Sequence, residues 1–149
     1  MLRDFENITA LNKVCKEIFN NNIIFIGHKV KKDYIIDLIN NYKTDDECYL
    51  LKQIDNYLEL PGHFNENLNG QRLYVSLFSS SSERLVKEIK NIINERKFCE
   101  NYKYIIHIGR FLSEEYKILS ISKLNFNNKE IELESILKFN MMTNSYEYV

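Results

Sequence analysis

The sequence predicts a single globular domain over residues 1–149 with a mixed α/β (α+β) fold, built on a sheet of about five strands. Short apolar runs alternate with amphipathic helical stretches up to residue 111, and strands separated by helices pair in parallel through crossovers. After residue 111 the strand patterns are joined by short polar links, which are typical of hairpins. The expected sheet is therefore parallel in its first part, with crossover helices, and ends in a C-terminal antiparallel meander.

The clearest unit, residues 71–97, predicts a strand, a turn and a helix. Its apolar run, residues 73–78, is rich in aromatic and β-branched side chains and predicts a strand covered on both faces. Four serines end this run, and Ser80 with Glu83 forms the pattern of a capping box at the start of a helix. The apolar stripe of that helix consists of Leu85, Ile89, Ile92 and Ile93.

Three helices and one strand are expected before this unit. Residues 2–20 and 33–42 have the apolar stripes of two helices, and residues 23–26 form a short buried strand that Gly27 ends. Thr44 and the three carboxylates after it predict the N-terminal cap of a third helix. The apolar stripe of this third helix would be Leu50, Leu51, Ile54, Tyr57 and Leu58, and Pro61-Gly62 would end it.

Three strands are expected after the central helix, over residues 104–111, 116–126 and 130–139. In the last of them, apolar side chains face the core at Ile131, Leu133, Leu137 and Phe139. The tail, residues 141–149, is either a final edge strand or loosely attached.

Composition limits the partners and the compartment. The net charge of −1 lacks the basic bias of a general nucleic-acid binder, so nucleic acid is not an expected partner. No apolar run approaches the roughly 18 residues of a membrane helix, and no membrane contact is expected. Asp4 and Glu6 stand where a secretory signal would be apolar, so we expect a soluble protein of the cytoplasm or of a host cytosol. Frequent Asn, Ile, Lys and Tyr, whose codons are rich in A and T, indicate a low-GC genome.

The three cysteines, Cys15, Cys48 and Cys99, are far apart and contain no Cys-x-x-Cys pair. We expect free thiols on helices in a reducing compartment. Their spacing and that of the three histidines do not support a zinc site, so neither a metal nor a cofactor is predicted.

One group of residues points to ligand binding, because ligands of open α/β sheets lie outside the carboxyl ends of the parallel strands. Those ends would carry serine hydroxyls at a helix N-terminus together with cationic side chains, which suit an anionic group. The candidate ligand-binding residues are His28, Lys29, Ser79, Ser80, Ser81, Ser82 and Arg110. In the alternative interpretation, Ser80 only caps a helix, Gly27 only forms a turn, and the cations are solvated. His107 lies between two isoleucines and would face the opposite layer, either as a hydrogen-bonded core histidine or as a catalytic one.

Tyrosine is abundant, and tyrosines anchor interfaces because they bury a large area yet keep a polar group. The candidate interaction residues are Tyr102, Tyr104, Tyr116, Tyr146 and Tyr148; the last two alternate along a C-terminal strand that could dock by strand addition or form a dimer edge. Core packing and codon bias are the alternative explanation.

Two function hypotheses follow. Because no stretch matches a diagnostic catalytic or metal motif, we favour a protein-binding module without catalysis, of the antitoxin, immunity, anti-defence or host-modulating kind, with a protein partner or as a homodimer. The alternative is a protein or enzyme that binds a nucleotide or another phosphate compound at the strand-end residues from Gly27 to Lys29, from Ser79 to Ser82 and at Arg110.

Two segments, FIGHKVKKDYIIDLI and LYVSLFSSSSERLVKEI, resemble strand–turn–helix units of TIR-type domains. The resemblance implies a wholly parallel sheet and places Glu88 nearest to the catalytic glutamate of that family. The chain lacks the Trp-Cys signature of the family, since it contains no Trp, and we do not assign it to the family.

Overall fold

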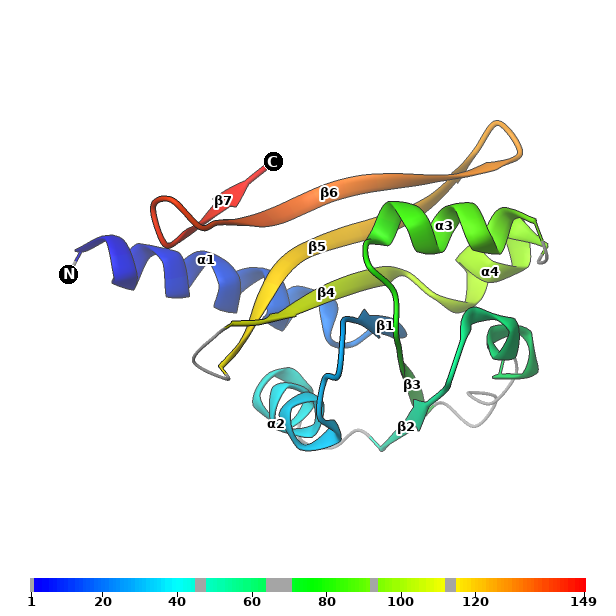
Figure 1. Ribbon diagram of the computed structural model, residues 1–149, viewed down its shortest axis with the longest axis horizontal. Helices are drawn as coiled ribbons and strands as arrows, with labels where there is room; N and C mark the ends of the chain where they lie inside the picture. The colour runs from blue at the N-terminus through cyan, green and yellow to red at the C-terminus, as the bar shows by residue number, and fades with distance from the viewer. Residues whose placement is uncertain (1, 45–47, 64–70, 92–93, 112–114) are drawn as a thin grey trace.

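The structure is a computed structural model that describes residues 2–44, 48–63, 71–91, 94–111 and 115–149 (Figure 1). The helices are α1 (Leu2–Ile18), α2 (Lys32–Tyr42), α3 (Ser82–Lys90) and α4 (Glu95–Asn101), with a 3₁₀ helix η1 (Tyr57–His63). The strands are β1 (Ile23–Ile26), β2 (Tyr49–Gln53), β3 (Arg72–Leu77), β4 (Tyr104–Arg110), β5 (Tyr116–Asn127), β6 (Glu130–Asn140) and β7 (Ser145–Tyr148).

All seven strands belong to one sheet in the order β2-β3-β1-β4-β5-β6-β7. The strands from β2 to β4 are parallel, and those from β4 to β7 pair in an antiparallel meander. The predicted mixed fold is therefore confirmed. Two strands exceed the expected number: β2, and the tail strand β7, which pairs with β6 at the edge of the sheet.

The third predicted helix is wrong. Residues 49–53 form β2, which pairs in parallel with β3, and η1 follows it. The reason is that the consecutive apolar residues Leu50 and Leu51 pack on opposite faces of the sheet, as successive residues of a strand do. Leu58, expected in the helical stripe, is exposed. The expected cap at 45–47 lies outside the described residues, and Thr44 donates its hydroxyl hydrogen to Asn20 Oδ1 at 2.8 Å.

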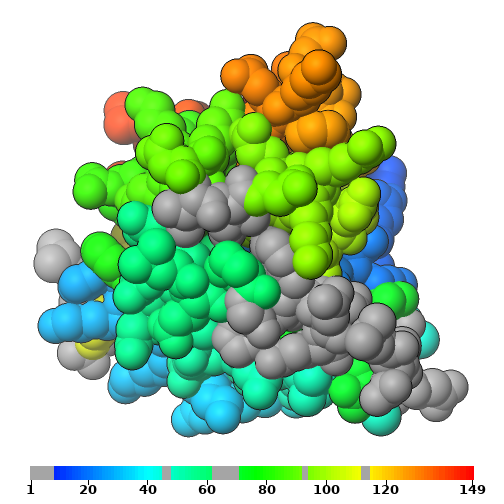
Figure 2. Space-filling model, turned by 90° about the vertical axis from the view of Figure 1, so that its right-hand side faces the viewer, coloured from blue at the N-terminus to red at the C-terminus, as the bar shows by residue number. Residues whose placement is uncertain are grey.

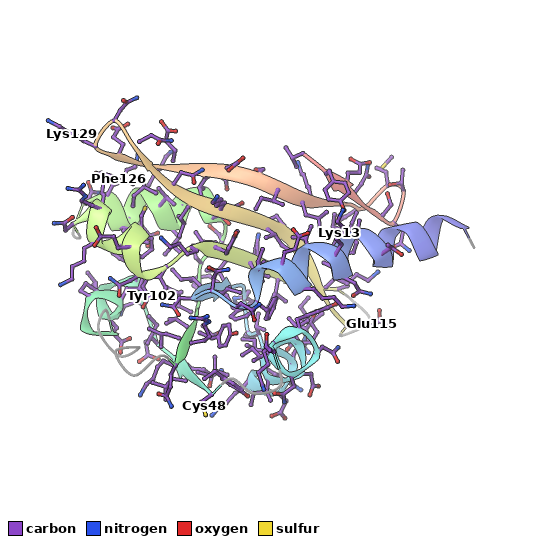
Figure 3. All side chains as sticks on the ribbon, turned by 180° about the vertical axis from the view of Figure 1, so that it is seen from behind. Lys13, Cys48, Tyr102, Glu115, Phe126 and Lys129 are labelled. Carbon is purple, nitrogen blue, oxygen red and sulfur yellow. The ribbon has the colours of Figure 1, made fainter. Side chains whose placement is uncertain are left out.

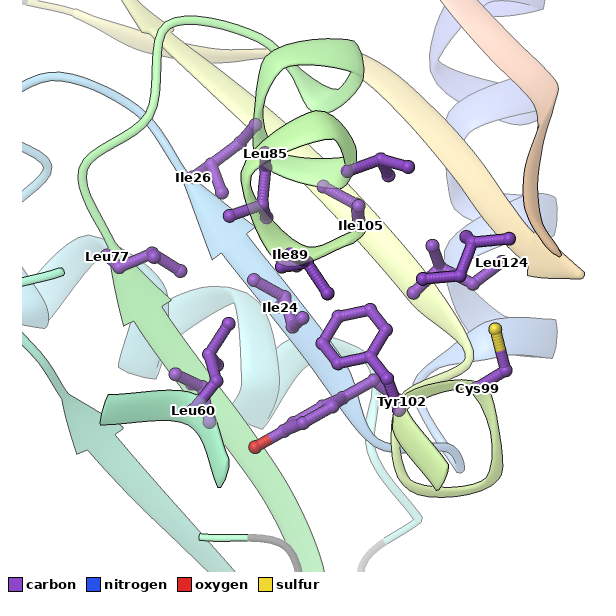
Figure 4. Packing of buried hydrophobic residues seen from close by; sticks show 14 of the residues in the cluster. Ile24, Ile26, Leu60, Leu77, Leu85, Ile89, Cys99, Tyr102, Ile105 and Leu124 are labelled. Atoms are coloured by element: carbon purple, nitrogen blue, oxygen red, sulfur yellow. The ribbon is translucent and has the colours of Figure 1, made fainter. Parts of the chain in front are cut away.

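Helices cover both faces of the sheet. On one face, α1 and α2 pack against a cluster that includes Ile23, Phe25 and Ile106. On the other, α3, α4 and η1 pack against a cluster that includes Ile24, Ile105 and Leu124. Figure 4 shows the second cluster, with Tyr102, Leu60 and Ile89 lying among the strand residues. We call these the α1–α2 face and the α3–α4 face.

The last long strand crosses from one face to the other. A register shift in the β5–β6 pairing lies between Ile121 and Ser122, where Ile121 pairs with Leu137 and Ser122 with Ser135. The extra residue in β6 turns the side chains after it to the opposite face. Hence Ile131 packs on the α3–α4 face and Leu137 on the α1–α2 face. The β5–β6 hairpin extends beyond α3 and α4 at the top of Figure 2, with Lys129 at its tip in Figure 3.

The central helix begins one residue later than its capping box predicts. Ser81, not Ser80, is the N-cap, and its Oγ accepts a hydrogen bond from the Arg84 amide at 3.1 Å. The predicted single helix is also two helices, because α3 ends at Lys90 and Asn94 caps α4. Two residues of the predicted stripe, 92 and 93, lie outside the described part of the chain.

Among the described helices, none combines the length and the apolar character that crossing a membrane requires.

Candidate functional site

The order of the strands creates a crevice at the carboxyl edge of the sheet. β1 and β3 are neighbours, and both point toward this edge. The chain leaves β1 for α2 on the α1–α2 face and leaves β3 for α3 on the α3–α4 face. The two connections therefore separate from each other immediately after the strands end. Such a switch point is where ligands of open α/β sheets bind.

A cavity of about 750 Å³ lies at this edge, and we call it the strand-end cavity. Its volume falls within the range of small-molecule sites, roughly 300–1,000 Å³. Polar side chains from three segments border it: His28, Ser79, Ser80, His107 and Arg110. The rest of its lining is apolar or backbone: Phe78, Ile108, Gly109, Phe111, Leu119 and Met141.

The structure thus brings together four of the seven predicted ligand residues: His28, Ser79, Ser80 and Arg110. Ser81 is occupied as the cap of α3. Ser82 is buried, and its hydroxyl has no hydrogen-bond partner among the described residues.

Lys29 is separated from this group although it follows His28 directly. Its backbone adopts a left-handed conformation with φ of 54°, and its carbonyl accepts a hydrogen bond from the hydroxyl of Tyr116 at 2.8 Å. Lys29 borders a smaller cavity of about 160 Å³, together with Gly27 and Gln53. Lys29 thus borders a neighbouring cavity that shares Phe78 with the strand-end cavity, while His28 lines the strand-end cavity itself.

Gly27 ends β1 where two backbones approach closely. A Cβ atom at this position would lie 2.5 Å from the carbonyl oxygen of Ile108 in β4 and 2.6 Å from Val30 Cγ2. Glycine is thus required by contact with the neighbouring strand, in addition to the turn that the sequence predicts. The absence of a side chain at Gly27 thus lets the end of β1 lie close against Ile108 of β4.

His107 faces the cavity from β4. Ile106 and Ile108 pack on the α1–α2 face, so the alternation of the strand turns His107 to the α3–α4 face, as expected. Desolvation by burial lowers the pKa of His107, and the negative charge of Glu83 in α3 opposes that shift. The imidazole is therefore held toward its neutral form, in which one nitrogen accepts and the other donates a hydrogen bond.

Arg110 stands at the end of β4 beside an aromatic pair. Its guanidinium lies 5.9 Å from the centroid of the Tyr116 ring, and Tyr116 in turn packs on Tyr34 with centroids 5.0 Å apart. Because the Tyr116 hydroxyl also holds the carbonyl of Lys29, this side chain links the ends of β1, β4 and β5. Tyr116 therefore supports the strand-end cavity.

Phe78 is the feature of this site that the sequence did not reveal. Its place at the end of an apolar run predicted a buried strand residue, yet it follows β3 and is 59% exposed. A second cavity, of about 590 Å³, shares Phe78, Ser79 and Ser80 with the first. Its remaining lining includes Asp55, Asn56, Tyr57, Arg84 and Glu88. Phe78 also borders the smaller cavity beside Lys29, so it stands among three cavities.

Of the five predicted interaction tyrosines, one is buried and three are half-buried. Tyr102 is fully buried and Tyr104 is half-buried. The hydroxyl of Tyr146 donates to the carbonyl of Ile118 at 2.9 Å, and burial raises its pKa. Of the five, Tyr148 is exposed, at 60%.

The described residues contain no group of three or more His, Cys, Asp or Glu side chains that could hold a metal ion. The cysteines are free thiols; Cys15 and Cys99 lie on helices, as expected. Cys48 does not, because it directly precedes β2 at the surface (Figure 3).

Comparison with models of protein families and with curated proteins finds no match for this chain. The antiparallel half of the sheet departs from the wholly parallel sheet that the TIR resemblance implies. Glu88 forms an ion pair with Arg84 along α3, with Nε and Oε1 3.1 Å apart.

Proposed function

We propose that the protein binds a small organic phosphate in the strand-end cavity. The observation that carries this proposal is the meeting of His28, Ser80 and Arg110 around one cavity at the switch point of the sheet. A guanidinium donates charge-assisted hydrogen bonds to phosphate oxygens, and an imidazole N–H and serine hydroxyls donate further ones. The apolar remainder of the lining suits the organic part of the ligand.

The test is calorimetric titration of the protein with inorganic phosphate, ribose 5-phosphate and AMP, followed by the same titrations of Arg110→Ala. Loss of one hydrogen bond to a charged group, about 1.5–3 kcal/mol, weakens binding by roughly 10- to 150-fold. Arg96→Ala is the matched control, because Arg96 is an exposed arginine of α4 that borders a different cavity. Equal losses in the two variants, or no binding of either ribose 5-phosphate or AMP, would refute the proposal.

A second candidate is a protein-binding module without catalysis. The observation that favours it is the exposed apolar surface of the C-terminal segment, where Met141, Met142, Tyr148 and Val149 are 69%, 95%, 60% and 73% exposed. Apolar groups that gather at the surface mark interaction sites. The expected result is a dimer or a defined complex in light scattering that the double variant Met142→Glu/Tyr148→Glu abolishes. A complex that survives this double variant would exclude the C-terminal segment as its interface.

A further inference from the structure

Phe78 is an aromatic side chain that borders the strand-end cavity and is exposed to solvent. It is 59% exposed, whereas the other phenylalanines whose side chains the structure describes are buried or half-buried. Water contact forfeits the favourable burial of a large apolar ring. An exposed ring that borders a cavity is therefore positioned to be covered by whatever fills that cavity.

The surroundings of Phe78 leave a place for a second ring. The imidazole of His28 meets the Phe78 ring edge-on, with centroids 5.2 Å apart and an interplanar angle of 70°. Apolar side chains of Leu119 and Met141 line the same cavity. A flat heteroaromatic group entering the cavity would contact the phenyl ring of Phe78 and these apolar groups together. Thioether and aliphatic groups pack well against aromatic rings.

We propose that the ligand carries an aromatic ring that stacks on Phe78, so that the preferred ligands are nucleotides rather than sugar phosphates or inorganic phosphate. This inference rests on the proposed function, because His28 and Arg110 would hold the phosphate while Phe78 holds the base. A sugar phosphate satisfies only the polar part of the lining and leaves Phe78 in water. Stacking of a base on an aromatic side chain tolerates different bases, so both purine and pyrimidine nucleotides should bind.

The experiment compares AMP with ribose 5-phosphate, which share the sugar and the phosphate and differ in the base. Both are titrated calorimetrically into the unaltered protein, Phe78→Ala and Leu58→Ala. Leu58 is the matched control, since it is an apolar residue with almost the same exposure, 58%, and lies outside the lining of both cavities. Loss of one stacked base is expected to weaken AMP binding of Phe78→Ala about tenfold or more, and Phe78→Tyr should restore it. Ribose 5-phosphate binding should change little in every variant.

Three results would overturn the inference. Equal affinity of the unaltered protein for AMP and ribose 5-phosphate would show that the base makes no contact, while the proposed function would stand. Equal losses for both compounds in Phe78→Ala would show that Phe78 shapes the cavity without stacking on the ligand. Absence of binding by both compounds would overturn the proposed function together with this inference.

Discussion

Replacing Asn22 by alanine should destabilise the fold more than replacing any neighbouring asparagine. Asn22 is 8% exposed and precedes β1. Its Oδ1 accepts a hydrogen bond from the buried amide of Leu73 at 2.8 Å, and its Nδ2 donates to the carbonyl of Asn101 at 2.7 Å. One side chain thus joins the beginning of β1, the beginning of β3 and the end of α4.

The expected loss is about 2–4 kcal/mol. Each ordinary hydrogen bond contributes about 0.5–1.5 kcal/mol, and a buried group left without a partner costs about 1–3 kcal/mol. The buried N–H of Leu73 would be left without a hydrogen-bond partner, because Leu73 is fully buried and no side chain would replace the amide oxygen of Asn22. Asn21→Ala is the control; its Nδ2 donates to the carbonyl of Ile18 at 3.1 Å in a half-buried position, so its loss should stay near 1 kcal/mol.

Urea unfolding measures both variants. Far-UV circular dichroism reports on the whole fold, and tyrosine fluorescence is usable because the chain contains ten tyrosines and no tryptophan. With a slope of about 2 kcal/mol per molar urea, in the middle of the usual range, the midpoint of Asn22→Ala should fall by roughly 1–2 M. Asn22→Asp should also destabilise the fold. Its carboxylate keeps an oxygen that accepts from the Leu73 amide, but it places a second acceptor oxygen, with no hydrogen to donate, against the carbonyl of Asn101. The reasoning is refuted if Asn22→Ala and Asn21→Ala lose equal stability.

Three further predictions concern α3, the cavity wall and the thiols. Ser81→Ala should lower the free energy of unfolding by about 1 kcal/mol, because Ser81 is the residue that caps α3. Ser80→Ala should change it by no more than about 0.5 kcal/mol. Equal losses of the two variants in urea unfolding would contradict the assignment of Ser81 as the cap. Burial lowers the pKa of His107 below its unfolded value, so the unfolded state binds the proton more tightly and stability should fall as pH drops below about 6.5. His107→Gln should lose less stability than the unaltered protein over that pH range, as urea midpoints at each pH will show. Of the three cysteines, Cys48 alone is exposed, and burial raises the pKa of the other two thiols to about 12 and about 11. Mass spectrometry after iodoacetamide should show one label on the folded protein, at Cys48, and three after unfolding; rapid labelling at two or more sites of the folded protein would contradict this.

The sequence predicted those elements whose signal is local. β1 was assigned to its correct residues because four consecutive apolar side chains between Asn22 and Gly27 suit a strand covered on both faces. The β5–β6 hairpin was also expected, since its link is short and both strands are long. In both cases the residues that decide the structure lie within the element itself.

β2 was missed because its evidence lies in another segment. The run from Tyr49 to Gln53 is short and half-buried, and its spacing fits a helix as well as a strand. Its strand conformation is stabilised by pairing with β3, which lies some 20 residues later in the chain. The backbone hydrogen bonds between the two segments extend one residue past β2, where the Ile54 amide donates to the carbonyl of Ser76 at 2.9 Å. Periodicity within a segment does not contain that information. The cap of α3 was misplaced for a similar reason: four adjacent serines have equal propensity, and the end of β3 determines which of them begins the helix.

The candidate site could likewise be predicted only where its signal is local in the sequence. The sequence indicated which residues follow each strand, but strand order determines which strand ends are neighbours. Placing β1 between β3 and β4 brings His28, Ser80 and Arg110 together, although they lie far apart along the chain. At Lys29 the backbone is left-handed and its carbonyl accepts a hydrogen bond from Tyr116, and Lys29 borders a smaller cavity next to the one that His28 lines. A variant at Lys29 should therefore leave phosphate binding almost unchanged while Arg110→Ala weakens it. That contrast in calorimetry would distinguish a site built by sheet topology from a general attraction of anions to the cations at this edge.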